Sequence, residues 1–185
     1  MVTLYHLNHG CKDCTTGYIF DLLPIKIADG AEHAEAYEEW RRAFPSGLSV
    51  FGYRHMTPEQ PFGEVPQPKL RLEWECEKVR LKYFPHILSR YQAFFGVATL
   101  KEALAFRQAT LMESGLTGSI WEVEAESISH RGDMRLLTYT NYSQANLLAY
   151  WEGKALDGGE PIWECMIKPP VTMIKCVVQD DTTVA

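Results

Sequence analysis

Residues 162–178 read IWECMIKPPVTMIKCVV, two short apolar stretches separated by a pair of prolines. Both stretches are rich in β-branched, aromatic or sulfur-containing residues, which is typical of buried β-strands. Because proline lacks a backbone N–H, Pro169 and Pro170 are expected to separate the two strands. We therefore predict strands over residues 162–167 and 171–178, with Glu164 as the acidic residue inside the first strand.

Working outward, the sequence predicts short strands mixed irregularly with helices. Periodicity predicts strands over residues 2–7, 50–53, 94–95, 120–126 and 135–140, and helices over residues 31–44, 71–83, 100–112 and 144–151. Short, half-buried strands favour antiparallel pairing, and regular alternation of strand and helix is missing. The predicted fold class is therefore α+β rather than a doubly wound parallel sheet.

Capping residues predict where three of the helices begin. Asp29 with Glu32, and Thr99 with Glu102, have the three-residue spacing of a capping box. Ser143 can cap the helix that follows it. The Pro- and Gly-rich residues 45–68 are predicted to be a long irregular segment, and such a loop is often functional.

Composition limits the classes of function. The chain has 185 residues, which predicts one domain, and 18 basic against 24 acidic residues give a formal charge of −6. An acidic chain argues against charge-driven binding to nucleic acid or to anionic membranes. The sequence has no apolar run of the ~18 residues that a membrane span needs, nor a recognisable cleaved signal peptide. We expect a cytoplasmic protein, or one secreted into a host cell without a cleaved signal.

The cysteines allow several interpretations. Five cysteines is an odd number, which argues against a full disulfide framework and fits a reducing compartment. Cys11 and Cys14 form a Cys-x-x-Cys motif close to His6 and His9. A structural zinc site needs four ligands, and no second pair is evident. Zinc binding, redox activity and two partly buried thiols all remain open for this motif.

Common enzyme signatures are missing from the sequence. It contains no Gly-x-Gly-x-x-Gly after a strand, no phosphate-binding Gly-Lys-Ser/Thr loop, no His-Glu-x-x-His and no Gly-x-Ser-x-Gly. Residues 89–103, SRYQAFFGVATLKEA, instead join an aromatic strand to a capped helix. An arginine beside such a strand can hold a phosphate while an aromatic side chain stacks on a planar ring.

Each of these residues also has a purely structural interpretation. Phe94 can be a core residue, Arg90 a surface charge and Ser89 a turn residue. A lone histidine such as His6 on an apolar strand face is more often a core residue than a ligand. Glu164 can simply face solvent, as most glutamates do.

The order of these features resembles the diphtheria-toxin-like branch of the ADP-ribosyltransferase superfamily, which includes the poly(ADP-ribose) polymerases and small bacterial members. That branch has a histidine on the first strand, a Tyr-Phe-Ala strand entering a helix, and a late glutamate. His6, Phe94-Phe95-Gly96 and Glu164 occupy these places. Phe94 replaces the tyrosine, so it could stack but not donate a hydrogen bond. The resemblance implies an ADP-ribosyltransferase-like domain over residues 1–179, with split antiparallel sheets and flanking helices, followed by a frayed tail over residues 180–185.

The resemblance also implies a chemistry in which NAD⁺ is the substrate. Cleavage of its nicotinamide–ribose bond passes through an oxocarbenium-like state, as in glycoside hydrolysis. The implied catalytic residues are Glu164, His6 and Phe94, with Glu160 as a rival and Asp133 as a weaker rival for the acid. The implied cofactor-binding residues are His6, Asn8, Ser89, Arg90, Tyr91 and Phe94, and no metal is expected.

The implied activity is mono-ADP-ribosyl transfer to an acceptor. The expected acceptor is a protein, and host ubiquitin is a candidate if the chain is a bacterial effector or toxin. Residues 45–68 are an expected acceptor-recognition surface, because loops often carry specificity. The alternatives are an NAD glycohydrolase, a non-catalytic NAD- or ADP-ribose-binding module, and a zinc-binding module. The oligomeric state is not encoded in any motif.

Overall fold

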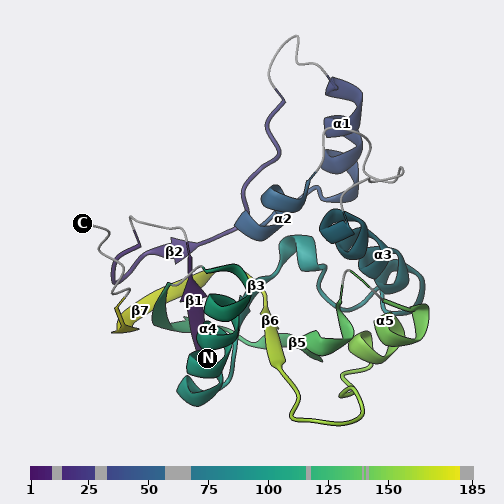
Figure 1. Ribbon diagram of the computed structural model, residues 1–185. Helices are drawn as coiled ribbons and strands as arrows, with labels where there is room; N and C mark the ends of the chain where they lie inside the picture. The colour runs from purple at the N-terminus through teal and green to yellow at the C-terminus, as the bar shows by residue number, and fades with distance from the viewer. Residues whose placement is uncertain are drawn as a thin grey trace.

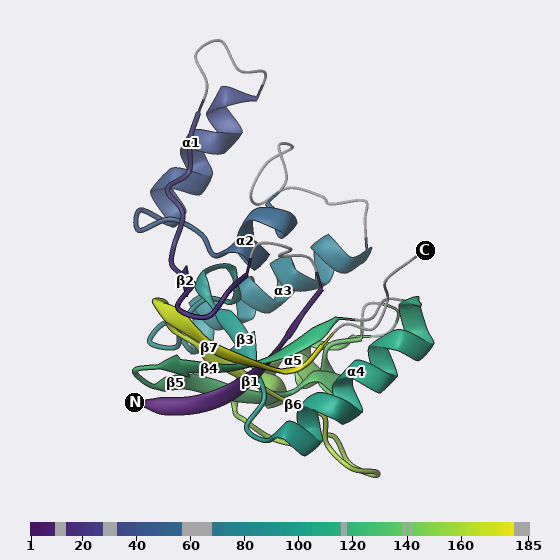
Figure 2. The same cartoon turned by 90° about the vertical axis from the view of Figure 1, so that its left-hand side faces the viewer.

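The computed structural model describes residues 1–9, 14–27, 33–56, 68–115, 118–138, 140 and 142–179. These residues form two antiparallel β-sheets with helices packed around them (Figures 1 and 2). The predicted α+β class is therefore confirmed. Among the helices of these ranges, none combines the length and the apolar character that crossing a bilayer requires.

The first sheet has four strands in the order β1-β4-β7-β2, and the second has three in the order β3-β6-β5. The strands of the first sheet are β1 (Val2–Asn8), β4 (Ser119–Ala125), β7 (Val171–Val178) and β2 (Ile19–Phe20). Those of the second are β3 (Phe94–Gly96), β6 (Trp163–Ile167) and β5 (Ile128–Asp133). All strand pairs are antiparallel, as predicted.

The two sheets are joined at one edge of each. The backbones of Tyr5 and Val97 exchange hydrogen bonds of 2.9 and 2.8 Å, which link β1 to the residue that follows β3. A second link is residues 168–170, since β6 belongs to one sheet and β7 to the other. The two strands of residues 162–178 therefore exist as predicted but do not pair with each other.

The helices cover the sheets and extend beyond them. They are α1 (Ala34–Ala43), α2 (Val50–His55), α3 (Pro68–Tyr83), α4 (Leu100–Ser114) and α5 (Gln144–Trp151), with short 3-10 helices η1 (Arg90–Gln92) and η2 (Met134–Leu136). Figure 1 shows α3 beside α5, whereas α1 projects away from the sheets. In Figure 2, α4 lies along the sheet side that contains β1.

Local sequence signals correctly place several elements. The alternation in β4 buries Trp121, Val123 and Ala125. The capping box at α4 is present: the Thr99 hydroxyl accepts from the Glu102 N–H, and the Glu102 carboxylate accepts from the Thr99 N–H. Ser143 caps α5 as predicted.

The start of α1 differs from the prediction. The helix begins at Ala34, and its N-cap is His33, which has a φ of 67° and makes no capping hydrogen bond with its side chain. Asp29 and Glu32, the predicted capping pair, lie outside the described residues, as does the predicted tail at 180–185.

The predicted strand over residues 50–53 is wrong, because these residues form α2. The Ser49 hydroxyl accepts a hydrogen bond of 3.1 Å from the Gly52 N–H and so caps the helix. Ser49 also donates from its backbone N–H to the Tyr91 carbonyl oxygen at 2.9 Å. This capping and tertiary contact override the strand propensity of Val50 and Phe51.

Gly52 is required where α2 meets η1. A Cβ atom at this position would lie 2.0 Å from the Tyr91 carbonyl oxygen. We expect Gly52→Ala to lower the free energy of unfolding by about 1–3 kcal/mol, the usual cost of an overpacked contact. Urea unfolding would measure it, and Val50→Ala on the exposed side of the same helix should change stability by less than about 0.5 kcal/mol. Equal effects of the two substitutions would contradict this explanation.

The predicted strand over residues 135–140 is also wrong, since the chain turns at Asp133 into η2. The Asp133 carboxylate accepts from the backbone N–H groups of Arg135, Leu156 and Ile162 at 3.0–3.1 Å. Burial by itself would raise the pKa of Asp133, but the Arg135 side chain and these N–H groups lower it overall. Asp133 is therefore an ionised anchor for two segments.

Candidate functional site

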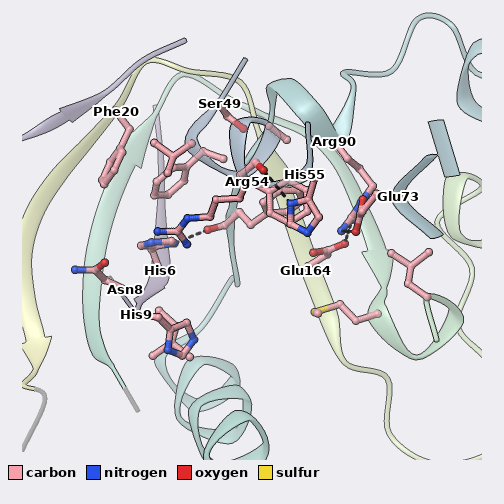
Figure 3. Close-up of a pocket in the computed structure, with 18 of the residues that line it drawn as sticks. His6, Asn8, His9, Phe20, Ser49, Arg54, His55, Glu73, Arg90 and Glu164 are labelled. Atoms are coloured by element: carbon pink, nitrogen blue, oxygen red, sulfur yellow. Dashed lines mark hydrogen bonds and ion pairs between the residues drawn. The ribbon is translucent and has the colours of Figure 1, made fainter. Parts of the chain in front are cut away.

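A cavity of about 440 Å³ lies between β1, β3, β6 and α2, and Figure 3 shows residues that line it. This volume is within the range of small-molecule sites. Five of the seven predicted site residues line it: His6, Asn8, Arg90, Phe94 and Glu164. A smaller cavity of about 90 Å³ also has both His6 and Glu164 in its wall. The histidine of the first strand and the late glutamate are thus neighbours of the same space.

His6 presents one nitrogen that can accept a hydrogen bond. Its Nδ1 lies 2.8 Å from the carbonyl oxygen of Phe95, which can only accept, so Nδ1 carries the proton. Burial lowers the pKa of His6 to about 4; the hydrogen bond with Phe95 opposes this shift, and smaller contributions from His9 and Arg54 add to it. At neutral pH the ring is therefore neutral, and Nε2 can accept a hydrogen bond from a ligand hydroxyl.

The low pKa of His6 makes stability depend on pH. Between about pH 6.5 and 4, the unfolded chain binds a proton at His6 that the folded protein does not, so stability falls as the pH falls through this window. Between pH 7.5 and 4.5 we expect wild type to lose about 2 kcal/mol more unfolding free energy than His6→Gln. Urea unfolding at the two pH values would measure this, and identical losses would show that His6 ionises normally in the fold.

The rings of His6, Phe20 and Phe94 form an aromatic surface. The centroids of the His6 and Phe94 rings are 4.3 Å apart, and those of Phe20 and Phe94 are 4.9 Å apart. These side chains come from β1, β2 and β3, so the surface exists only because the two sheets meet. Asn8 lies at the end of β1 and also lines the cavity.

Glu164 is held in a buried polar network. Its Oε1 accepts from Arg90 Nη1 and, at 2.6 Å, from the Tyr150 hydroxyl. Oε2 makes no hydrogen bond with any residue in the described part of the chain. The side chain is 5% exposed yet lines both cavities, so Oε2 is the carboxylate oxygen that a ligand could meet.

Arg90 lines the cavity, but its guanidinium is engaged by protein groups. It donates to both oxygens of Glu73 at 2.7 and 3.1 Å, and to Glu164 and Tyr150. Burial opposes its charge, but the Glu164 and Glu73 carboxylates raise the pKa of Arg90 well above its usual value. Arg90 is buried and already paired with two carboxylates, which leaves its guanidinium poorly placed for the pyrophosphate that the resemblance implies.

Ser89 and Tyr91 lie in the protein core rather than on the cavity. The Ser89 hydroxyl donates to Glu77 at 3.0 Å and accepts from the Tyr91 N–H. Tyr91 is 1% exposed and packs against Trp40 and Phe44 of the α1 region. Neither residue lines the cavity, and both position η1.

Phe95, not Phe94, shares a sheet face with Glu164. Phe95 pairs with Met166, and the Tyr150 hydroxyl contacts both Met166 and Glu164. Since side chains alternate along a strand, Phe94 lies on the opposite face, with Ile167. Both Phe94 and Phe95 nevertheless line the cavity.

The rival acids are not placed in the cavity. Glu160 is exposed in the segment before β6 and does not line the cavity, and Asp133 is the anchor described above. The geometry therefore favours Glu164 over both.

Only one cysteine of the Cys-x-x-Cys motif lies within the described residues. Cys14 is buried and takes part in a disulfide, so the interpretation as two thiols does not hold for it, and Cys11 lies outside the described residues. Cys76, Cys165 and Cys176 are free. Within the described ranges, no group of three or more His, Cys, Asp or Glu residues could hold a metal ion.

Several cavity residues were not predicted from the sequence. Phe20 comes from a two-residue strand, and Phe51 and Arg54 come from the helix that was predicted to be a strand or loop. Their i, i+3 spacing is compatible with one helix face, but so short a segment carries little periodic signal.

The fold and the site together define the class: an α+β protein with a cavity between two linked antiparallel sheets. The family model described as "Protein of unknown function (DUF2441)" matches residues 65–179, more than half of the chain. The protein belongs to this family. No curated protein matches the chain. The matched residues include Arg90, Phe94 and Glu164, whereas His6 and α2 lie before them.

Proposed function

We propose that this protein transfers ADP-ribose from NAD⁺ to an acceptor, as the resemblance to ADP-ribosyltransferases implies. The observation that supports the proposal most is the single cavity lined by His6, Phe94 and Glu164, from strands far apart in the sequence. A proposal built on the order of three short motifs requires this proximity. A buried carboxylate on the opposite side of the molecule from His6 would have excluded it.

In the proposed reaction, one bond to C1′ of the ribose breaks and another bond to C1′ forms. The bond between C1′ and the nicotinamide nitrogen breaks, and its electron pair leaves with neutral nicotinamide. The acceptor nucleophile forms the new bond to C1′ and releases its proton to solvent. The charge that develops on the ribose is positive, so a fixed carboxylate stabilises the transition state more than the ground state.

Each cavity residue has a role in this proposal. Oε2 of Glu164 faces the developing cation and orients the nucleophile. Nε2 of neutral His6 accepts from a ribose hydroxyl. Phe94, whose ring lies beside that of His6, offers a flat apolar surface for the nicotinamide ring.

The test is incubation of the purified protein with NAD⁺ that is labelled in its ADP-ribose part, with and without a cell lysate. Release of nicotinamide together with a labelled macromolecule would support transfer, and a labelled protein band of ubiquitin size would point to that acceptor. Release with free ADP-ribose only would support the NAD glycohydrolase instead. Absence of nicotinamide release under both conditions would overturn both enzymatic proposals.

A second candidate is a module that binds NAD⁺ or ADP-ribose without turnover. Two observations favour it: Glu164 Oε1 is tied to Arg90, and Phe94 has no hydroxyl where the resembling family has tyrosine. Calorimetric binding of ADP-ribose without any nicotinamide release would select this function.

A further inference from the structure

We propose that Arg54 of α2 is the contact for a ligand diphosphate, in place of Arg90. This inference rests on the proposed function, because it identifies the group of NAD⁺ that is recognised by the part of the cavity beside α2. Arg54 lines the cavity and is exposed. It forms no hydrogen bond or ion pair with a residue inside the described ranges.

The charges around the cavity leave Arg54 available to an anion. The described carboxylates that line the cavity are Asp21, Glu73 and Glu164. Glu73 and Glu164 are both paired with Arg90. Asp21 accepts from the adjacent Leu22 N–H at 2.7 Å. A guanidinium keeps its charge and can bind phosphate through two parallel hydrogen bonds, so an anionic ligand would find its partner at Arg54.

The position of Arg54 fits a ligand with a ring on either side of its phosphates. One aromatic surface is that of His6, Phe20 and Phe94. The other is formed by Phe51, whose ring centroid is 4.0 Å from that of His55 and 4.7 Å from that of Phe95. Figure 3 shows the Arg54 side chain reaching from the helix that carries His55 toward His6. A dinucleotide has this arrangement, because its diphosphate joins two ring-bearing nucleosides.

The substitution Arg54→Gln tests the inference with two pairs of probes. ADP-ribose carries a diphosphate and a terminal ribose that adenosine lacks. NAD⁺ carries a diphosphate and an adenosine that nicotinamide riboside lacks, and these two share the scissile bond. We expect Arg54→Gln to weaken calorimetric binding of ADP-ribose by about 10- to 100-fold, the range for a charged hydrogen bond. Arg54→Lys should restore part of the affinity, because ammonium makes a point contact. The kcat/KM for nicotinamide riboside should change less than about threefold.

The matched control is Arg41→Gln, which removes one exposed positive charge from α1, where Arg41 pairs with Glu38 and does not line the cavity. Unchanged ADP-ribose binding in Arg54→Gln would overturn the inference, and so would equal losses toward NAD⁺ and nicotinamide riboside. Wild-type protein that binds ADP-ribose no better than adenosine would overturn it as well. Binding that depends on Arg54, without nicotinamide release, would support the inference while the transferase proposal fails.

Discussion

Replacing Glu164 with Gln is expected to reduce nicotinamide release from NAD⁺ by about 10²–10³-fold, the usual effect of removing a group that stabilises transition-state charge. Gln has nearly the same shape and can still contact Tyr150, but it carries no negative charge opposite the ribosyl cation. The loss should appear in kcat more than in KM, because the charge develops during the reaction. Steady-state kinetics with quantified nicotinamide would measure it.

Two controls separate this effect from lost stability. Glu73→Gln removes the other carboxylate that pairs with the Arg90 guanidinium. It should therefore lower the melting temperature about as much as Glu164→Gln does, while kcat falls less than about tenfold. Glu160→Gln changes the exposed rival acid and should leave kcat as in wild type. If Glu73→Gln and Glu164→Gln lower kcat equally, Glu164 acts on Arg90 and not on the substrate.

Replacing Arg90 with Met is expected to have the largest effect on stability. The side chain is buried and is the cation between Glu73 and Glu164, so its loss leaves two buried carboxylates without their charged partner. Breaking a buried ion pair in this way costs about 3–5 kcal/mol of unfolding free energy. Urea unfolding at pH 7.5 would measure the loss.

The pH dependence of this loss identifies its cause. In Arg90→Met, the buried carboxylates would hold protons that the unfolded chain releases, so the deficit should grow from pH 5 to pH 8. The control is Lys154→Met, which breaks the exposed pair with Glu152 and should cost less than about 1 kcal/mol. A deficit below 1 kcal/mol for Arg90→Met, or one that does not depend on pH, would contradict this account.

Local sequence patterns correctly predicted the elements that are stabilised by interactions among neighbouring residues in the sequence. Alternation predicted β4, the two prolines predicted the break between β6 and β7, and Thr99 with Glu102 predicted the start of α4. The segments predicted wrongly depend on distant residues instead. Ser49 contacts Tyr91 across 42 positions, and Asp133 accepts from Ile162 across 29 positions. No window of local periodicity contains such contacts.

The same distinction applies to the site. The resemblance identified Glu164, His6 and Phe94 as site residues, and the structure places all three on the cavity. It could not show that Arg90 is neutralised by Glu73, which lies 17 positions before it, and by Glu164, which lies 74 positions after it. Nor could composition show that Arg54 reaches the cavity, because that depends on how α2 packs on η1.

The packing of α2 on η1 determines the positions of two charged groups on the cavity wall. Gly52 and Ser49 contact the Tyr91 backbone. Tyr91 directly follows Arg90, and the Arg90 guanidinium donates a hydrogen bond to the Glu164 carboxylate. The positions of Arg54 and of the Glu164 carboxylate on the cavity wall therefore both depend on one contact, that of α2 with η1.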